Sequence, residues 1–483
     1  MKKSVFKNYI YSIMYQMLIL IVPLLVMPYI SRTLSADGIG MYGYSNAITQ
    51  YFILFGCAGL NLHGQREVAY CQDDSEKRTT VFFELFCIRV FCLTISLFVF
   101  LFTACNSIRY QTIFQIQILE FFAAIFDISW FFQGMEEFKK IVIRNSIVKV
   151  ASAACIFIFV TSPEDVWKYT LIYSLSNFIG NLSVWAYLPK YLIKVRFKDL
   201  KFKRHIRMII LLFVPQMATS VYNLLDKSMI GWLTENDSEV AFYEQAQKIM
   251  KTALAIPTAL GTVMMPKIAS LYKKDEKDQI VEYLKKSFHI ICIIAFPLCF
   301  GIAGIAKSFI PWFLGNGYDK SVWNLIILSP IIVIVSISNI IGVQFLLPVG
   351  RHRVYTISVV LGTITNFLLN LILIPVFFSV GASVASVCAE LVVTMFQLWS
   401  IRRDFTVQGK LRKCYRYIFA SIIMYFAIFF MDFILKNHSA ITVFLRIGIG
   451  GIVYFSTLFM MKDEFLLSGL KAAVTWLSKK KSH

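Results

Sequence analysis

Residues 81–104 read VFFELFCIRVFCLTISLFVFLFTA and contain only two charged side chains, Glu84 and Arg89. A helix of this length rises about 36 Å, which exceeds the ~30 Å hydrocarbon core of a lipid bilayer. Comparable apolar stretches recur along the chain, 58% of its residues are hydrophobic, and its mean hydropathy is +0.66. The sequence therefore predicts an all-α, polytopic membrane protein with about 14 transmembrane helices, at 9–30, 42–62, 81–104, 111–134, 143–161, 167–189, 208–232, 241–266, 287–306, 321–348, 354–378, 381–401, 415–436 and 440–461.

The net charge of +20 would by itself be compatible with nucleic-acid binding, but its distribution indicates another cause. If the N-terminus is cytoplasmic, 37 of the 48 Lys and Arg residues lie in or beside cytoplasmic segments, six lie on the opposite side, and five lie at membrane depth. This asymmetry follows the positive-inside rule. We therefore predict a multi-pass protein of the cell membrane, with cytoplasmic N- and C-termini and no nucleic-acid partner.

Several catalytic and cofactor motifs are absent from the sequence. It contains no GxxxxGK[ST] loop for ATP phosphates, no HExxH or GxSxG motif, and no Cys/His cluster with metal-ligand spacing. The ten cysteines are scattered, mostly within predicted helices, where they act as small apolar residues. The outer loops are too short to hold a catalytic domain. We therefore expect no enzymatic activity, no cofactor and no metal site.

Two segments 201 residues apart, Ile39–Ile48 and Val240–Ile249, are weakly similar. Together with equal helix counts, this similarity indicates that the first six and the next six helices are structural repeats. An even number of helices per repeat makes the repeats parallel, related by an axis along the membrane normal. We predict an N-lobe at 1–200, a C-lobe at 201–405, and a last segment at 406–483 with two further helices and a cytoplasmic tail.

The predicted helix at 208–232 carries a polar stripe at membrane depth. Its members are spaced four, three and four residues apart, which places them on one helix face. They are Gln216, Ser220, Asn223 and Lys227, with Asp226 beside them. Hydrocarbon cannot satisfy these side chains, so this face either lines a wet interior or packs on another helix.

Cations also occur deep within other predicted helices. A charge at mid-membrane costs at least ~2.5–3.5 kcal/mol on insertion scales, so such residues tend to face a cavity. Arg89 lies about 12 Å inside its helix, which is too deep for simple snorkelling to the interface. Glu244 precedes Lys248 by four residues, an order that favours a local ion pair. We predict a cationic cavity lined by Arg89, Lys227, Lys248 and Lys251, with Gln247 among its polar residues.

Polar residues also occur in two further predicted helices. In the predicted helix at 111–134, Gln117, Glu120 and Asp127 are spaced three and seven residues apart and share one face. Arg446 lies near the outer end of its predicted helix, where its side chain can snorkel to the interface. Arg446 therefore needs no functional role.

A series of short motifs occurs in order along nearly the whole chain. The motifs are PYISRTL at 28–34 with Gly38, Gly40 and Tyr42; GLNLHGQREVA at 59–69; Asp226 and Lys227 followed by Tyr243 and Lys248; and NFLLNLILIP at 366–375 with Gly381, Ala382 and Ala385. Together they resemble the Wzx-type polysaccharide flippases, which belong to the superfamily of multidrug, oligosaccharidyl-lipid and polysaccharide (MOP) exporters. His63 departs from the family pattern, because tyrosine is expected there in the most similar relatives.

The resemblance implies two six-helix lobes around a central cavity, plus two extra helices. It implies a flippase that moves oligosaccharide repeat units on undecaprenyl diphosphate from the inner to the outer leaflet of the bacterial plasma (inner) membrane by alternating access. A diphosphate needs cationic partners, and the resemblance adds Arg32 and Arg66 to them. It implies coupling to an ion gradient, for which Glu120 and Asp127 are the acids best placed in this sequence. The implied partners are the lipid-linked oligosaccharide, membrane lipids, and, as candidates, a polymerase and a chain-length regulator of the same pathway.

Three other functions remain open at this point. A peptidoglycan lipid-precursor flippase would also handle a lipid-linked diphosphate. A multidrug cation antiporter shares the two-lobe fold, although its cavity is typically acidic and it typically has twelve helices. A membrane-embedded polymerase or ligase would need a large outer loop, which the sequence lacks.

Overall fold

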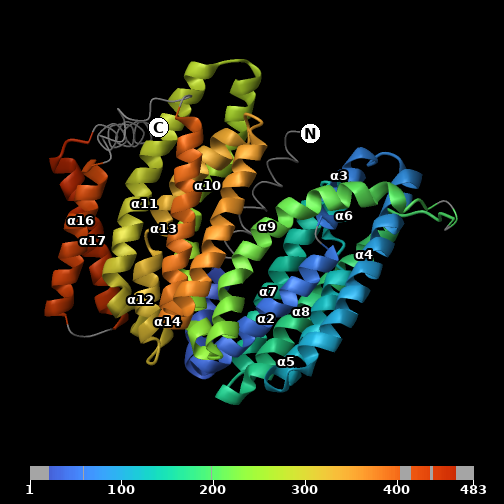
Figure 1. The fold of residues 1–483 in the computed structure, drawn as a ribbon, viewed down its shortest axis with the longest axis horizontal. Coiled ribbons are helices and arrows are strands. Elements are labelled where there is room, and N and C mark those ends of the chain that lie inside the picture. The colour runs from blue at the N-terminus through green and yellow to red at the C-terminus, as the bar shows by residue number, and fades with distance from the viewer. Residues whose placement is uncertain are drawn as a thin grey trace, which may run out of the picture. The chain divides into compact units, whose positions relative to one another are not determined.

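The computed structural model describes residues 21–57, 59–196, 198, 200–402, 415–435 and 439–463. The side chains of Phe138, Val214, Pro215, Ala218, Thr219, Tyr222 and Asn223 lie outside this description. Over the described ranges the regular secondary structure is helical and no strand occurs (Figure 1). The predicted all-α class is confirmed.

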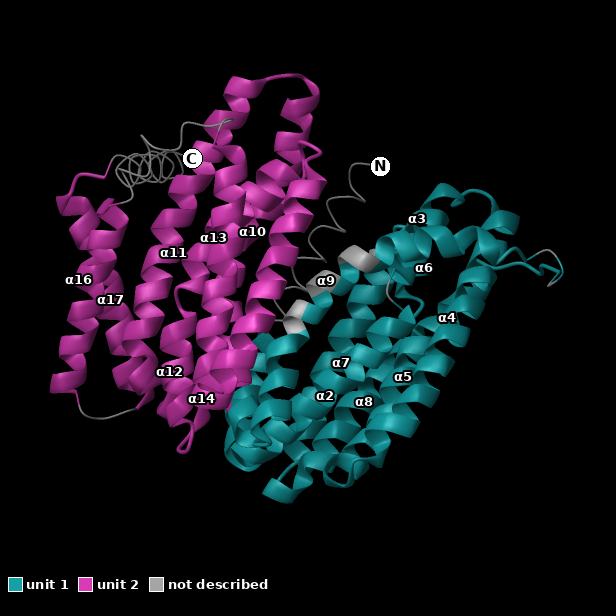
Figure 2. Cartoon of the chain, viewed as in Figure 1, with its two compact units in different colours: residues 1–241 teal, residues 242–483 magenta. Residues whose placement is uncertain are grey.

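The chain divides into two compact units, Met1–Ala241 and Phe242–His483 (Figure 2). The first unit begins, within the described residues, with an apolar helix at Ile21–Thr33. Its further α-helices are α2 (Ser35–Cys57), α3 (Leu60–Tyr70), α4 (Ser75–Thr103), α5 (Gln111–Ile125), α6 (Ser129–Gly134), α7 (Phe138–Phe159), α8 (Val166–Ser183) and α9 (Lys203–Thr234). A 3₁₀ segment, η4 (Val184–Lys190), follows α8.

The second unit is also built of helices. Helix α10 begins at the end of the first unit and supplies most of its length to the second. The helices are α10 (Asp237–Lys273), α11 (Lys277–Leu314), α12 (Asp319–Leu328), α13 (Ile331–Asn339), the π-helical η6 (Ile340–Leu346), α14 (His352–Ile401), α16 (Tyr415–Ile434) and α17 (Ala440–Met460).

The division into units differs from the lobe boundary expected after residue 200. The difference concerns α9, which packs against α2 and α3 and therefore belongs to the first compact unit. The lobes at 1–200 and 201–405, and the last segment at 406–483, stay predictions.

Nine helical stretches within the described residues are long and apolar enough to cross a membrane. One of them, Ser75–Asn106, contains the apolar run at 81–104, and another, Asp319–Leu346, joins α12, α13 and η6. The predicted polytopic membrane architecture is confirmed. The total of 14 transmembrane helices stays a prediction.

Gly59 divides the predicted helix at 42–62 into α2 and α3. Its φ is 83°, in the left-handed region that glycine adopts without strain. A Cβ at Gly59 would lie 2.4 Å from the backbone oxygen of Ile209 in α9. The missing side chain therefore lets α9 pack directly on this break. The approach also allows the Gly59 N–H to donate to Gln216 Oε1 at 2.8 Å.

Helix α14 contains the two predicted helices at 354–378 and 381–401, joined by a sharp bend. The bend lies at Phe378, whose φ and ψ are 54° and −133°. A Cβ at Gly381 would lie 2.4 Å from the backbone oxygen of Leu373, so the chain turns back tightly on itself. Only a glycine at 381 permits this close approach.

Candidate functional site

The guanidinium of Arg89 is held inside the first unit by groups from α3 and from the end of α5. Arg89 is 2% exposed. Its Nε donates to the backbone oxygen of Ala124 at 2.6 Å, and its Nη1 donates to Asn61 Oδ1 at 2.6 Å. Its Nη2 lies 3.7 Å from Asp127 Oδ2. The structure thus brings together two of the predicted site residues, Arg89 and Asp127, as an ion pair.

This arrangement limits what Arg89 and Asp127 can do separately. Arg89 can bind a phosphate only by exchanging at least one of its present acceptors. Asp127 can take up a proton only at the expense of its attraction to the guanidinium. Substrate binding by Arg89 and ion coupling by Asp127 stay predictions.

Glu120 has neutral hydrogen-bond donors instead of a cation. Asn177 Nδ2, from α8, lies 3.1 and 3.3 Å from the two carboxylate oxygens of Glu120. One turn earlier, Gln117 accepts from Thr49 Oγ1 at 2.6 Å and donates to Ser45 Oγ at 3.1 Å. The polar face of α5 therefore packs on α2 and α8. A buried carboxyl group with an amide partner can exchange a proton without breaking an ion pair, which favours Glu120 over Asp127 for ion coupling.

The polar stripe on α9 also packs partly on neighbouring helices. Gln216 accepts from the Gly59 N–H, and Tyr51 of α2 shares a hydrogen bond of 3.1 Å with Ser228. Asp226 is buried, whereas Ser220 and Lys227 are half-buried. The side chain of Asn223 lies outside the described residues. Cavity lining by these residues stays a prediction.

In the second unit, α10 presents a more open polar face. Lys248 Nζ lies 2.9 Å from Glu244 Oε1, which confirms the local ion pair expected from their spacing, and the Lys248 side chain is 39% exposed. Gln247 Nε2 donates to Tyr243 OH at 3.0 Å, and this hydroxyl shares a hydrogen bond of 2.9 Å with Ser386 of α14. Lys251 is exposed. Lys248 and Lys251 are therefore accessible cations.

Arg32 and Arg66 differ from Arg89 because both are exposed. The guanidinium carbon of Arg66 lies 5.5 Å from the ring centroid of Tyr70, one turn further along α3, in a cation–π contact. Their roles in substrate binding stay predictions. The cationic cavity as a whole also stays a prediction, because its predicted members belong to two different compact units.

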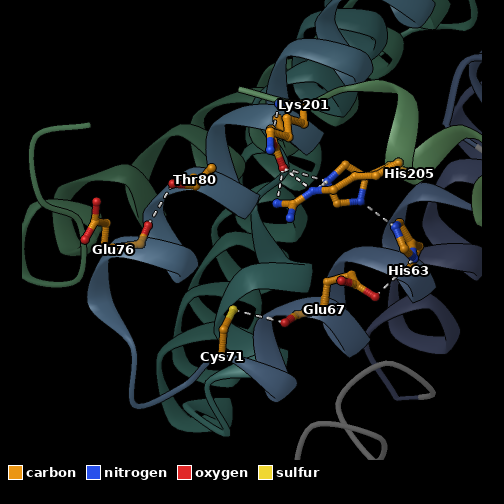
Figure 3. Close-up of polar contacts among 9 residues, drawn as sticks. His63, Glu67, Cys71, Glu76, Thr80, Lys201 and His205 are labelled. Carbon is orange, nitrogen blue, oxygen red and sulfur yellow. Dashed lines mark hydrogen bonds and ion pairs between the residues drawn. The ribbon is translucent and has the colours of Figure 1, made fainter. Parts of the chain in front are cut away.

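A histidine cluster that no sequence motif indicated lies where α3, α4 and the start of α9 meet (Figure 3). His205 Nε2 lies 2.8 Å from Glu84 Oε2, and His205 Nδ1 lies 2.8 Å from His63 Nε2. Glu84 is 0% exposed and also accepts from the Arg204 guanidinium and the Lys201 backbone N–H. One buried carboxylate therefore fastens the segment at 201–205 to α4.

The hydrogen bonds assign the protons in this cluster. If His205 is neutral and donates from Nε2 to Glu84, its Nδ1 accepts from His63 Nε2. His63 Nδ1 is then unprotonated, and it has no hydrogen-bond partner among the described residues. It lies 3.9 Å from Glu67 Oε1. Burial lowers the pKa of His63 below its ordinary value, so the neutral imidazole is favoured near pH 7.

The cluster offers sites for protons rather than for a metal. In the part of the chain that the structure describes, no group of three or more His, Cys, Asp or Glu residues is arranged to hold a metal ion. The sequence did contain one signal for the cluster. Glu84 stands in the apolar run at 81–104, and a carboxylate buried there requires a donor from elsewhere in the chain.

The expectation that Arg446 snorkels to the interface is wrong. Arg446 is 0% exposed, and its Nη2 lies 3.0 Å from Asp432 Oδ1 of α16. Asp432 makes burial of the arginine possible, because the ion pair offsets part of the desolvation cost. Arg446 therefore links α16 to α17.

The fold defines the class of protein. The solved structure of the lipid II flippase MurJ, in an inward closed conformation, matches with a TM-score of 0.76, covering 95% of this chain and 100% of that chain at 15% identity. An inward-facing multidrug resistance transporter of the MATE family, within the MOP superfamily, matches with a TM-score of 0.61, covering 80% of this chain and 98% of that chain at 12% identity. The chain thus has the fold of MOP transporters.

The sequence then identifies the family within this class. Residues 5–272, more than half of the chain, match the family described as "Polysaccharide biosynthesis protein". The chain belongs to this family, and the resemblance inferred from the motifs is confirmed. A relative from Escherichia coli (strain K12), named "Putative O-antigen transporter", is 24% identical over 412 residues, which cover 83% of this chain and 98% of the relative.

Proposed function

We propose that this protein is a flippase that moves oligosaccharide repeat units, linked to undecaprenyl diphosphate, from the inner to the outer leaflet by alternating access. The observation that carries the proposal is the family match, together with a relative named as an O-antigen transporter that aligns over nearly its whole length. The fold of MOP transporters supplies a suitable helical scaffold. The buried polar residues within the apolar spans give it polar groups at membrane depth.

The cations of α9 and α10 suit the charge of the proposed substrate. Lys248 keeps part of its side chain exposed while paired with Glu244, and Lys251 is exposed. An incoming diphosphate would offer these ammonium groups charge-assisted hydrogen bonds that are shorter and stronger than neutral ones. The sugar would use amide and hydroxyl groups such as Gln247 and Ser220. The polyprenyl tail would remain in the bilayer.

Ion coupling in this proposal belongs to Glu120, with Asp127 as the second candidate. An alternative driving force is the membrane voltage, because an anion that leaves a negative interior gains ~2.3 kcal/mol per charge per 100 mV. Proteoliposomes with an imposed voltage but no ion gradient distinguish the two. Transport that responds to voltage and persists in Glu120→Gln would indicate electrophoretic flux. Transport that depends on a proton gradient, with this dependence lost in Glu120→Gln, would indicate ion coupling.

The decisive experiment measures translocation by the purified protein in liposomes. A polyprenyl diphosphate oligosaccharide labelled with a fluorophore is placed in both leaflets, and a membrane-impermeant quencher reports the label that reaches the outer leaflet. We expect rapid exposure of the label with the protein and slow exposure in protein-free liposomes. Equal rates in the two would refute the proposal.

The same liposomes test the two transporters with the same fold. If the peptidoglycan lipid precursor moves as fast as the oligosaccharide lipid, the protein is a flippase of broader or different specificity. If a cationic dye moves while both lipids stay in place, it is a multidrug exporter. Competition between the labelled lipid and unlabelled repeat units of different sugars would then define the substrate.

The proposed location is the bacterial plasma (inner) membrane, with both termini in the cytoplasm. The distribution of Lys and Arg supports this orientation. Reporters that are active only in the cytoplasm, fused at either end, should both be active. In the cell, a polymerase and a chain-length regulator of the same pathway would receive the transported units, and cross-linking from the outer loops would detect such contacts.

A further inference from the structure

A cavity of about 520 Å³ opens between α7, α8 and η4 in the first unit. Its size falls in the range of pockets that hold small organic ligands. Its lining combines three cations with a group of apolar side chains, beside Glu137, Ser183 and Tyr187. The cations are Lys139, Lys140 and Arg144, and the apolar residues include Ile143, Ile147 and Ile179.

The cationic end lies at the beginning of α7. Lys140 is paired with Glu137, at 3.6 Å, and its Nζ lies 4.5 Å from the ring centroid of Tyr191. Arg144, one turn further, donates from Nη2 to Ser129 Oγ at 3.0 Å and from Nη1 to Asn181. These contacts hold both cations beside the cavity. With three cations and one carboxylate, Glu137, in its lining, this end of the cavity is positive.

The apolar part of the cavity faces outward along the same helix. Ile143 and Ile147 are separated by one turn and are exposed, as is Ile179 on α8. In a membrane protein, exposed isoleucines on a spanning helix face lipid. Ile147 lies about 12 Å along α7 from Lys139, so the lining changes from charged to apolar toward the centre of the membrane. The positive-inside distribution predicts that the charged end is cytoplasmic.

Gly180 gives the cavity its floor. A Cβ at this position would lie 2.8 Å from Val148 Cγ2, so α8 approaches α7 as closely as a glycine allows. The two helices therefore meet closely at Gly180, which belongs to the lining of the cavity. A ligand that enters from the bilayer would have its polar head beside the cations and its chain along the isoleucines.

We propose that this cavity binds an anionic glycerophospholipid of the inner leaflet, with the phosphate at Lys139 and Arg144 and an acyl chain across Ile143, Ile147 and Ile179. The sequence of charge and hydrophobicity along α7 matches such a lipid, and basic pockets between spanning helices on the cytoplasmic side bind anionic head groups in membrane proteins. The bound lipid would hold α7 and α8 together at the membrane surface. The proposal does not depend on the transported substrate.

The test is lipid binding to the purified full-length protein, measured by native mass spectrometry in detergent. Phosphatidylglycerol should bind about tenfold more tightly than phosphatidylcholine, which lacks net charge. Lys139→Glu reverses the charge at the head-group end, and Ile147→Trp fills the apolar end. Each substitution should weaken phosphatidylglycerol binding about tenfold, by independent means.

Two matched controls lie outside the cavity. Lys190→Glu makes the same charge change on the same predicted side of the membrane. Ile158→Trp makes the same apolar change on α7, where Ile158 is 65% exposed and Ile147 is 63% exposed. Both controls should bind phosphatidylglycerol as the wild type does. If they weaken binding as much as the cavity substitutions, the lipid binds elsewhere and the proposal fails.

Competition identifies the ligand. Equal binding of phosphatidylglycerol and phosphatidylcholine would overturn the proposal. Displacement of phosphatidylglycerol by inorganic phosphate would show a site for free anions, and stoichiometric displacement by a polyprenyl diphosphate would assign the cavity to the transported substrate. Either result would replace the proposed ligand. Persistence of phosphatidylglycerol against both competitors, with loss in the two cavity variants only, would support it.

Discussion

Helices α4 and α10 each carry an acid followed by a base a few residues later at membrane depth, yet they use them differently. In α10, Glu244 and Lys248 are four residues apart and pair with each other at 2.9 Å. In α4, Glu84 and Arg89 are five residues apart, so they point about 140° away from each other and cannot pair. Each recruits partners from other segments of the first unit instead. Spacing along one helix thus decides whether a buried charge pairs locally or joins distant segments.

The difference has a functional consequence. The α4 charges are enclosed by their partners, and their removal should damage the fold. The Lys248 ammonium is partly exposed, and its removal should leave the fold intact while affecting transport. Stability and transport can therefore be separated by substitutions in the two helices.

The largest effect is expected for Arg89→Met. The substitution would leave Asp127 without its cation and Asn61 without its donor, inside the membrane span. Breaking a buried ion pair from one side typically costs ~3–5 kcal/mol. Thermal unfolding in detergent should show a correspondingly large loss. Arg66→Met, at an exposed position, should change stability by no more than ~0.5 kcal/mol, and an equal loss in both would mean that Arg89 is not clamped as the structure shows.

A smaller loss is expected for Glu84→Gln. The amide keeps the size of the side chain but removes the charge that receives the Arg204 and His205 hydrogen bonds. Hydrogen bonds to charged groups contribute ~1.5–3 kcal/mol, and Arg204 can turn to solvent, so we expect a loss of ~2–3 kcal/mol. Hydrogen exchange should increase most at residues 201–205. Glu76→Gln, on the exposed first turn of α4, is the control, and unchanged exchange at 201–205 in Glu84→Gln would contradict the proposed fastening.

The sequence predicted those parts of the fold that depend on local patterns. Apolar runs gave the membrane helices, and a spacing of four residues gave the Glu244–Lys248 pair. The bend near Phe378 was also expected, as a short loop between two predicted helices. These features are encoded within a few residues of each other, so periodicity and spacing alone reveal them.

The sequence did not predict features that depend on contacts between distant segments. His63 and His205 are 142 residues apart, and their contact follows from the packing of α9 on α3. The cytoplasmic Lys and Arg residues were interpreted as a topology signal, although the Arg204 guanidinium and the Lys201 backbone N–H bind the buried Glu84 carboxylate. Arg446 was expected to snorkel because of its position near the end of its own helix. Its partner, Asp432, lies on a different helix and leaves no sign in that pattern. No single-helix pattern carries this information.

A transport defect with only a small stability defect is expected for Lys248→Gln. The Lys248 side chain is 39% exposed, and a glutamine amide can still donate a hydrogen bond to the buried Glu244 carboxylate, so the free energy of unfolding should change much less than in Arg89→Met. Loss of one ammonium from a diphosphate site should slow translocation about tenfold, which corresponds to ~1.4 kcal/mol. The liposome assay measures this rate. Lys267→Gln, at an exposed position on the same helix, should transport normally, and normal transport by Lys248→Gln would exclude Lys248 from the substrate site.

The smallest effect is expected for the pH dependence of stability caused by His63. Burial holds the pKa of His63 below its ordinary value of 6.5, while Glu67 opposes this shift and His205, Arg66 and Arg204 add to it. The unfolded chain therefore binds the proton first as the pH falls, so the stability that the neutral imidazole provides is present above pH 6.5 and decreases below it. Unfolding measured between pH 7.5 and pH 5.5 should show this decrease.

The substitution that tests the origin of this pH dependence is His63→Gln, which retains an amide N–H to donate to His205 but cannot titrate. The decrease in stability between pH 7.5 and pH 5.5 should then be smaller than in the wild type. His352→Gln, at an exposed histidine in α14, should leave the decrease unchanged. If His63→Gln also leaves it unchanged, the proton enters elsewhere. The fastening of α9 to α4 would then depend on Glu84 alone, and the contact between the two histidines would serve packing only.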